Sequence, residues 1–387
     1  MMDFSLTAWQ LQLKETARKF AIKEIMPLIP LMEEKKQTPR EIIAKMAELG
    51  FYAIQYPTKY GGGGASYVDY CLVMEELARV YCSIGGHLAV NNLCANTIYE
   101  FGTEEQKERY LPALLKGEAI GSFAFTEPDT GTDPEAIKTT ALKDGNYWII
   151  NGRKNFITNA TLPGYIVVFC RDVEIGGITN IIVPKDAPGY STGKLYEKMG
   201  MHGMEVAEVI FNNVRVPLEN TTGGEEGRGH GFKILTHIIA TGKLSISAQC
   251  VGMAQAALDA AADYARTRTQ KGKPIGHFQT IQWLIGEMAA EVEASRYMTL
   301  ATAWAKDQGS PILIESARCR LFTSQATHRV VNAAMQVMGA YGYIKEFPIE
   351  RLFRDMKLAE LYEGVNEIQR IISASPLLRE KHASART

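Results

Sequence analysis

The first third of the chain carries apolar residues at helical spacing. A first helix is predicted from an apolar stripe on one face, formed by Leu13, Ala17, Phe20 and Ile25. We expect Pro27 and Pro30 to end this helix, and capping boxes at 38–41 and 103–106 to begin two others. With further helical stretches at 68–80 and 88–101, the pattern predicts an all-helical domain over residues 1–118.

The pattern changes at about residue 121, where short β-branched and aromatic runs alternate with Gly, Pro and Asn. One run, Ile149 and Ile150, follows the Asp144-Gly145 turn, and the others span 165–170, 178–183 and 206–211. These runs predict strands of a compact middle β domain over residues 119–230.

Helical spacing returns at Gly231 and holds through four long segments, at 234–266, 280–306, 312–338 and 348–373. Four long helices in succession are typical of a bundle, so we expect a C-terminal four-helix bundle over residues 231–387. The predicted fold class is α+β, with the domains in the order α, β, α.

Charge and cysteine content narrow the classes of function. Among 387 residues there are 42 Lys and Arg against 43 Asp and Glu, so no whole-protein field favours nucleic acid or an anionic membrane. The six cysteines lie far apart without metal-ligand spacing, which predicts buried thiols of a reducing compartment and no metal site. No signal-peptide pattern and no apolar run of membrane-spanning length is recognised, so we expect a cytoplasmic protein without membrane insertion.

Several common catalytic motifs do not occur in the sequence, among them the GxxxxGK[ST] phosphate loop, HExxH and GxSxG. The glycine-rich stretches at 61–64 and 223–231 do not connect a strand to a helix within a βαβ unit. They are interpreted as loops, and a nicotinamide-linked reductase is accordingly the weakest alternative.

Five segments, in this order and at similar spacing, resemble the acyl-CoA dehydrogenase family. They are FAFTEPDTGTD at 123–133, NFITN at 155–159, RTRTQKGKP at 266–274, QVMGAYG at 336–342 and RDMKLAELYEGVNEIQR at 354–370. The resemblance covers nearly the whole chain. It implies the three-domain acyl-CoA dehydrogenase fold and a homotetramer with one non-covalent FAD per subunit, between the β domain and the bundle.

The resemblance also implies which residues contact the flavin. Phe125 and Thr126 would contact the ring, while Phe156 and Thr158 would cover it and hydrogen-bond it near N5. Arg268 would face the pyrophosphate of a flavin in the neighbouring subunit, as suits a planar fork donor. The same dinucleotide would be held by Gln270, Gln336 and Gly339. Without their motifs, Thr126 and Thr158 would be explained by the strand propensity of threonine. Arg268 would be explained as a solvated charge at a helix end.

Oxidising a saturated thioester requires a base for the α carbon and a hydride acceptor for the β carbon. By resemblance, the base is the glutamate of Tyr362-Glu363-Gly364 and the acceptor is flavin N5. We expect burial to raise the pKa of Glu363. Some relatives carry their base on an earlier helix, at a position that matches Gly242 here, which cannot serve. The alternative is that Glu363 is a surface carboxylate on an amphipathic helix.

The sequence departs from the family pattern at three positions and leaves the substrate open. Lys243 replaces an arginine near the base, Lys271 replaces an aromatic residue, and Val365 replaces a threonine. Thr132 matches a serine near the pantetheine, and with Lys243 and Gly364 it is assigned to the substrate. No Lys or Arg occurs over 82–93, a stretch that often lines the acyl pocket, so a dicarboxylate is disfavoured.

The small residues of 82–93 leave room for a branched or cyclic acyl group, and His87 in this stretch is interpreted as a packing residue. The sequence thus predicts FAD-dependent α,β-dehydrogenation of a short, branched or alicyclic acyl-CoA to the 2-enoyl-CoA. Electrons would pass to an electron-transferring flavoprotein, as the resemblance implies. The alternatives are an acyl-CoA oxidase on the same fold and a non-catalytic acyl-CoA-binding homologue.

Overall fold

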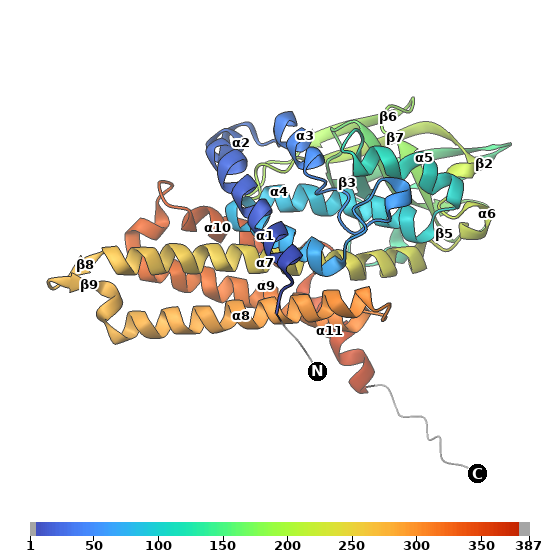
Figure 1. Cartoon of the computed structure of the whole chain (residues 1–387). Helices are drawn as coiled ribbons and strands as arrows, with labels where there is room; N and C mark the ends of the chain where they lie inside the picture. The colour runs from blue at the N-terminus through green and yellow to red at the C-terminus, as the bar shows by residue number, and fades with distance from the viewer. Residues whose placement is uncertain (1–4, 379–387) are drawn as a thin grey trace, which may run out of the picture.

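Three groups of elements follow one another in the computed structural model, which describes residues 5–378 (Figure 1). N-terminal helices lie beside a β-sheet, and long helices of the C-terminal bundle run beneath both. The predicted α, β, α order is confirmed.

The N-terminal helices begin and end differently from prediction in two places. Pro27 and Pro30 were expected to end the first helix, but helical turns continue through both positions. Each proline occupies a position in the first turn of a new helical segment, where a missing N–H costs nothing. The predicted cap at Thr38 is also wrong, since its hydroxyl donates 2.6 Å to the carbonyl of Gly203. The capping box between Thr103 and Gln106 is confirmed. The elements are α1 (Ala8–Phe20), a π turn (Ala21–Ile25), a 3-10 turn (Met26–Leu28), α2 (Ile29–Lys35), α3 (Arg40–Glu48), α4 (Tyr67–Phe101) and α5 (Glu104–Leu115).

Helix α4 is a folded pair of helices rather than one rod. Tyr81 has non-helical backbone angles, and Tyr67 near the start of α4 donates 3.2 Å to Asn96 near its end. A straight helix would separate these two residues by about 44 Å. The two halves therefore lie against each other, in agreement with the two separate stretches predicted from the sequence.

The middle domain is one sheet with the path β1-β4-β2-β3-β7-β6, while β5 pairs with β4. Strand β4 pairs in parallel with β1 and β2 and antiparallel with β5. No predicted run matches β1, β2 or β6, and the side chains of β6 are mostly exposed and lack an apolar run. The strands are β1 (Ile120–Ala124), β2 (Thr140–Asp144), β3 (Tyr147–Thr158), β4 (Gly164–Asp172), β5 (Ile178–Pro184), β6 (Tyr190–Leu195) and β7 (Val206–Pro217).

The C-terminal bundle has three long helices and a fourth segment that is broken. The predicted helix at 348–373 is interrupted at 361–365 by a non-helical turn. This turn contains the Tyr362-Glu363-Gly364 motif. The elements are α6 (Gly224–Gly227), α7 (Gly231–Thr267), the hairpin β8 (Thr269–Gln270) and β9 (Lys273–Pro274), α8 (Gln279–Asp307), α9 (Leu313–Met338), α10 (Ile349–Met356), a 3-10 turn (Lys357–Glu360) and α11 (Asn366–Leu378).

Helix α7 is the central element of the fold, because it packs against α4, α8 and α9. By length and composition alone, it is also the one helix within residues 5–378 that could cross a membrane. Of its most apolar window, 83% is buried in the protein. This burial is typical of a core helix.

Candidate active site

Glu363 lies in the turn between the 3-10 segment and α11, with a left-handed backbone (φ 52°), and Gly364 follows at φ 88°. Glutamate is uncommon in the left-handed region of backbone angles, and backbone strain of this kind is concentrated at functional sites. Both carboxylate oxygens are buried and have no hydrogen-bond partner among the described residues. The alternative of a surface carboxylate on an amphipathic helix is therefore wrong.

The space for this carboxylate is provided by Gly242 on α7. A Cβ atom at Gly242 would lie 2.1 Å from Oε2 of Glu363 and 2.8 Å from Cδ2 of Leu93 on α4. Glu363 thus fills the place where a side chain at position 242 would project. An acidic side chain at position 242 would therefore reach the place that the Glu363 carboxylate occupies.

Burial raises the pKa of Glu363 to about 7, while the nearby charges of Arg320 and Lys243 oppose the rise. Lys243 on α7 is itself buried, and burial lowers its pKa to about 8. The site thus holds a carboxylate whose pKa lies near neutral pH, and the cationic side chains of Lys243 and Arg320 lie near it.

Arg320 on α9 was not identified from the sequence. Its guanidinium is fully buried and donates to the carbonyls of Ala359 (3.0 Å), Tyr362 (2.6 Å) and Gly364. The sequence does contain a signal: Arg320 occupies the buried face of a helix whose other buried positions are apolar or small, such as Ala317, Cys319 and Thr323. A charge on such a face needs a buried partner.

Arg354 and Asp355 begin the segment at 354–370 that contains Glu363, and both residues have structural roles. Arg354 donates 3.1 Å to Glu33 on α2, and Asp355 accepts a hydrogen bond from the backbone of Met201, on the loop that leads into β7. These contacts join the bundle to both other domains just before the turn at 361–365.

The predicted flavin contacts on the β domain lie close together. The backbone N–H of Asn155 donates 2.8 Å to the carbonyl of Thr126, which joins the segment of Phe125 and Thr126 to that of Phe156 and Thr158. A buried ion pair between Lys154 and Glu127 (2.8 Å) supports the same junction. Phe156 has a left-handed φ of 59° and a 60% exposed ring, while Phe125 and Thr158 are buried.

The other predicted flavin contacts lie elsewhere in this chain. Arg268, Gln270, Gln336 and Gly339 are all exposed. They sit around the bundle end that carries β8 and β9, where the Arg268 guanidinium lies 5.7 Å from the Tyr341 ring centroid. In Figure 1 this end points away from the sheet. One chain alone therefore does not bring the two sets together.

Two other predicted features are placed as follows. Thr132 is exposed on the loop between β1 and β2. His87 is buried, with its ring nitrogens 2.7 Å from the Tyr52 hydroxyl and 2.8 Å from Oδ1 of Asn159, and burial lowers its pKa to about 4. This environment agrees with a packing role for His87.

All six cysteines are buried free thiols, and no group of His, Cys, Asp and Glu within residues 5–378 is arranged to hold a metal.

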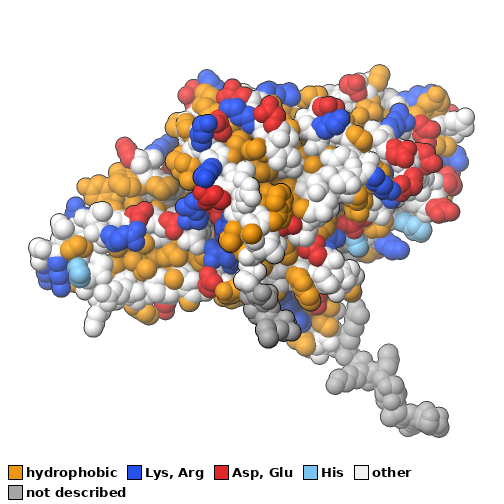
Figure 2. All heavy atoms as spheres, in the orientation of Figure 1, with side chains coloured by type: hydrophobic (Ala, Val, Ile, Leu, Met, Phe, Trp, Pro, Cys, Tyr) orange, Lys and Arg blue, Asp and Glu red, His pale blue; other side chains and the backbone are white. Residues whose placement is uncertain are grey.

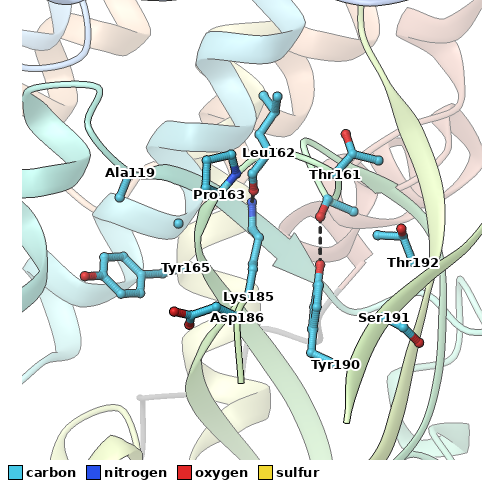
Figure 3. Close-up of a pocket in the computed structure, with 12 residues that line it drawn as sticks. Ala119, Thr161, Leu162, Pro163, Tyr165, Lys185, Asp186, Tyr190, Ser191 and Thr192 are labelled. Atoms are coloured by element: carbon cyan, nitrogen blue, oxygen red, sulfur yellow. Dashed lines mark hydrogen bonds between the residues drawn. The ribbon is translucent and has the colours of Figure 1, made fainter. Parts of the chain in front are cut away.

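An open cavity of about 670 Å³ lies on the β domain (Figure 3), and Glu363 is not among the residues that line it. Among its lining residues Lys185 is the one cation, and its ammonium donates to the carbonyls of Ile120, Asn159 and Leu162 at 2.7–3.0 Å. Because these bonds occupy its donors, Lys185 is not available to a ligand. The cavity is therefore not the candidate site.

Comparison with known proteins identifies the class. Three domain models match in succession: acyl-CoA dehydrogenase N-terminal domain at 7–118, middle domain at 122–214 and C-terminal domain at 229–378. The chain belongs to the acyl-CoA dehydrogenase family. It is an oxidoreductase with an acyl-CoA substrate, and the family depends on FAD.

The chain is 39% identical to the acryloyl-CoA reductase (NADH) of Anaerotignum propionicum, over 98% of this chain and 96% of that one. The structure of butyryl-CoA dehydrogenase from Megasphaera elsdenii superposes with a TM-score of 0.94 at 37% identity, covering 98% and 100% of the two chains. A structure described as the electron transferring flavoprotein of Acidaminococcus fermentans also reaches 0.94, at 40% identity and the same coverage.

The β-domain residues fit a flavin. Thr126 and Thr158 lie on the two segments that the Asn155–Thr126 backbone bond joins, and the Phe156 ring, which packs on Tyr196, is exposed and could meet a planar cofactor. These residues, with Phe125, would hold the ring system.

We predict that Gly242→Ala lowers turnover per bound flavin by about 10²-fold, because the added methyl group would displace the Glu363 carboxylate. Gly286→Ala on α8 is the control, since a Cβ there meets nothing within 4 Å. Flavin absorbance and steady-state kinetics check both variants. Equal turnover of the two variants would contradict the contact.

Proposed function

We propose that the chain oxidises a short-chain, branched or alicyclic acyl-CoA to the 2-enoyl-CoA, with Glu363 removing the α proton. The observation that carries this proposal is the pair of buried, unpartnered oxygens of Glu363. Buried carboxylates are ordinarily hydrogen-bonded, because leaving them unpaired costs stability. An exception inside a core points to a group kept free for chemistry.

The protonation state of Glu363 suits this role. A base works best when its pKa lies near the working pH, and that of Glu363 is about 7. Lys243 and Arg320 favour the ionised form without bonding to its oxygens, so the lone pairs stay open to the α hydrogen. Bound FAD supplies the acceptor for the β hydrogen.

The reverse reaction is a second candidate, favoured by the similarity to an acryloyl-CoA reductase. With a pKa near 7, Glu363 is partly protonated at neutral pH and can return a proton to the α carbon. We propose an electron-transferring flavoprotein as redox partner in either direction, because a chain with this fold, 40% identical to this one, occurs in a structure described by that name.

Anaerobic titration of the FAD-loaded protein with linear, branched and alicyclic acyl-CoAs tests the reaction and the substrate class. Bleaching of the flavin by one member supports the proposal, and reoxidation by an electron-transferring flavoprotein would identify the acceptor. Rapid peroxide formation in air would instead favour an oxidase. A protein that stays colourless after FAD is added would favour a non-catalytic acyl-CoA-binding homologue. Enoyl-CoA reduction by the photoreduced protein measures the reverse direction.

We predict that Glu363→Gln keeps flavin and acyl-CoA binding but loses at least about 10²-fold in turnover, because the amide cannot accept the α proton. Glu367→Gln is the control, as that side chain is exposed on α11 and pairs with Arg370. Stopped-flow reduction of the flavin measures both. Near-normal reduction by Glu363→Gln would remove Glu363 from the proposed role.

We predict that kcat/KM for dehydrogenation rises with pH through about 7, since the base must be ionised. The raised pKa also makes the ionised form unfavourable in the folded protein, so wild-type stability falls as pH rises from about 4.5 to about 7. Glu363→Gln should thus raise Tm relative to wild type at pH 8 and change it little at pH 5. Equal effects at both pH values would show that Glu363 has an ordinary pKa.

We propose that the protein is a homotetramer and that Arg268 completes the flavin site of a second copy. Arg268 and its neighbours lie far from the β-domain set, so another chain must supply one half. Figure 2 shows many hydrophobic side chains on the elongated bundle, and exposed aromatic residues of α8 include Trp283 (63% exposed) and Trp304 (58%). Such exposure is typical of an interface.

We place the tetramer in the cytoplasm, where its thiols stay reduced, and cell fractionation tests this location.

We predict a solution mass near four times the 42.9 kDa chain, measured by light scattering. Arg268→Gln should lower flavin content, whereas Arg266→Gln should not, because Arg266 pairs with Asp263 in its own chain. A monomer that retains its flavin would contradict this proposal.

A further inference from the structure

We infer that Arg320 positions the base, by fastening the turn at 361–365 to helix α9 through backbone carbonyls. This inference rests on the proposed role of Glu363 and adds a residue that no motif of the sequence indicated. Arg320 does not touch the reacting atoms, so it acts through Glu363.

The contacts of Arg320 are concentrated on the two residues that flank the base. It donates 2.6 Å to the carbonyl of Tyr362 and also donates to the carbonyl of Gly364, while a third bond of 3.0 Å reaches Ala359. A planar guanidinium can serve several acceptors in a fixed fork, which an ammonium on a flexible stem cannot match. The peptide units on both sides of Glu363 are thus held by one rigid group.

The turn needs such a support, because it lies between helical segments and contains two successive left-handed residues, Glu363 and Gly364. Helix α9 provides a second contact, where Ser324 and Asn366 hydrogen-bond at 3.0–3.2 Å. Gln369 on α11 donates 2.9 Å to the Gly364 carbonyl that Arg320 also binds. Arg320 is the charged member of this set.

Arg320 also supplies positive charge without occupying the base. Its hydrogen bonds go to the carbonyls of Ala359, Tyr362 and Gly364, and both oxygens of Glu363 remain unpartnered. The ionisable groups that interact with Glu363 are Arg320, Lys243 on α7, Tyr70 on α4 and Tyr362 beside the turn, while Glu360 interacts with Arg320. Burial raises the pKa of Glu363, and the positive charge of Arg320 opposes this rise more strongly than that of Lys243.

The test uses FAD-loaded protein with Arg320→Met, Arg320→Lys and a control, Arg329→Met. Arg329 lies on the same helix, but it is half exposed and pairs with Glu291 on α8 at 2.7 Å. One readout is kcat and KM per bound flavin across pH. The other is α-hydrogen exchange in D2O on an acyl-CoA analogue whose β carbon is replaced by sulfur. In this analogue the α proton passes to Glu363 and a solvent deuteron returns, with no hydride transfer.

For Arg320→Met we expect exchange and kcat to fall by about 10²-fold, with KM changed less than about threefold, because the base is misplaced. The pH midpoint should also move upward, because a charge that favours the carboxylate is lost. Arg320→Lys keeps that charge, so its midpoint should stay in place while kcat falls by about tenfold. Arg329→Met should match wild type in both readouts.

A purely structural role for Arg320 would lower thermal stability and flavin content, but it would leave exchange per flavin and the pH midpoint unchanged, and that result overturns the inference. If Arg320→Met does not fold, the kcat of Arg320→Lys decides. A wild-type kcat for Arg320→Lys would also overturn the inference. Failure of the proposed function is distinguishable, because Glu363→Gln would then retain exchange whatever Arg320 does.

Discussion

The candidate active site depends on holding one carboxylate, that of Glu363, inside the protein without a hydrogen-bond partner, although this costs stability. Burial of an unpaired carboxylate favours its neutral form, and two nearby cations counter this without bonding to it. Gly242 leaves the space, and the left-handed turn aims the side chain into it. The turn is where the fourth helical segment of the bundle breaks, so a local loss of regular structure serves the site.

Support for this turn comes from all three domains. Arg354 and Asp355 tie the preceding helix to α2 and to the loop before β7, while Arg320 and Ser324 tie the turn to α9. Helix α4, folded back on itself at Tyr81, brings Leu93 against Gly242 from the other side. Because these supports are rigid elements, the carboxylate is held in place before any ligand binds.

The proposed flavin site would have a different organisation, since the residues assigned to it lie in two separated parts of one chain. The β-domain half is built around the Lys154–Glu127 ion pair, and the bundle half around Arg268 and Tyr341. A cofactor that joined such halves would couple assembly to cofactor binding, because each would stabilise the other by mass action. The proposed tetramer is the arrangement that brings the halves together.

The sequence by itself determined the order of the domains, most long helices and the motif around Glu363, because helical periodicity and residue identity are local properties. It also suggested that burial would raise the Glu363 pKa. Only the tertiary structure decided that the helix predicted at 348–373 breaks at this motif, that Thr38 binds Gly203 rather than capping α3, and that Pro27 and Pro30 continue a helical course. Arg320 belongs to the same group, since its partners lie about 40 residues away and are backbone carbonyls, which no side-chain pattern reveals. At Thr38 and Arg320, a contact with a backbone carbonyl far along the chain decided the role of the side chain.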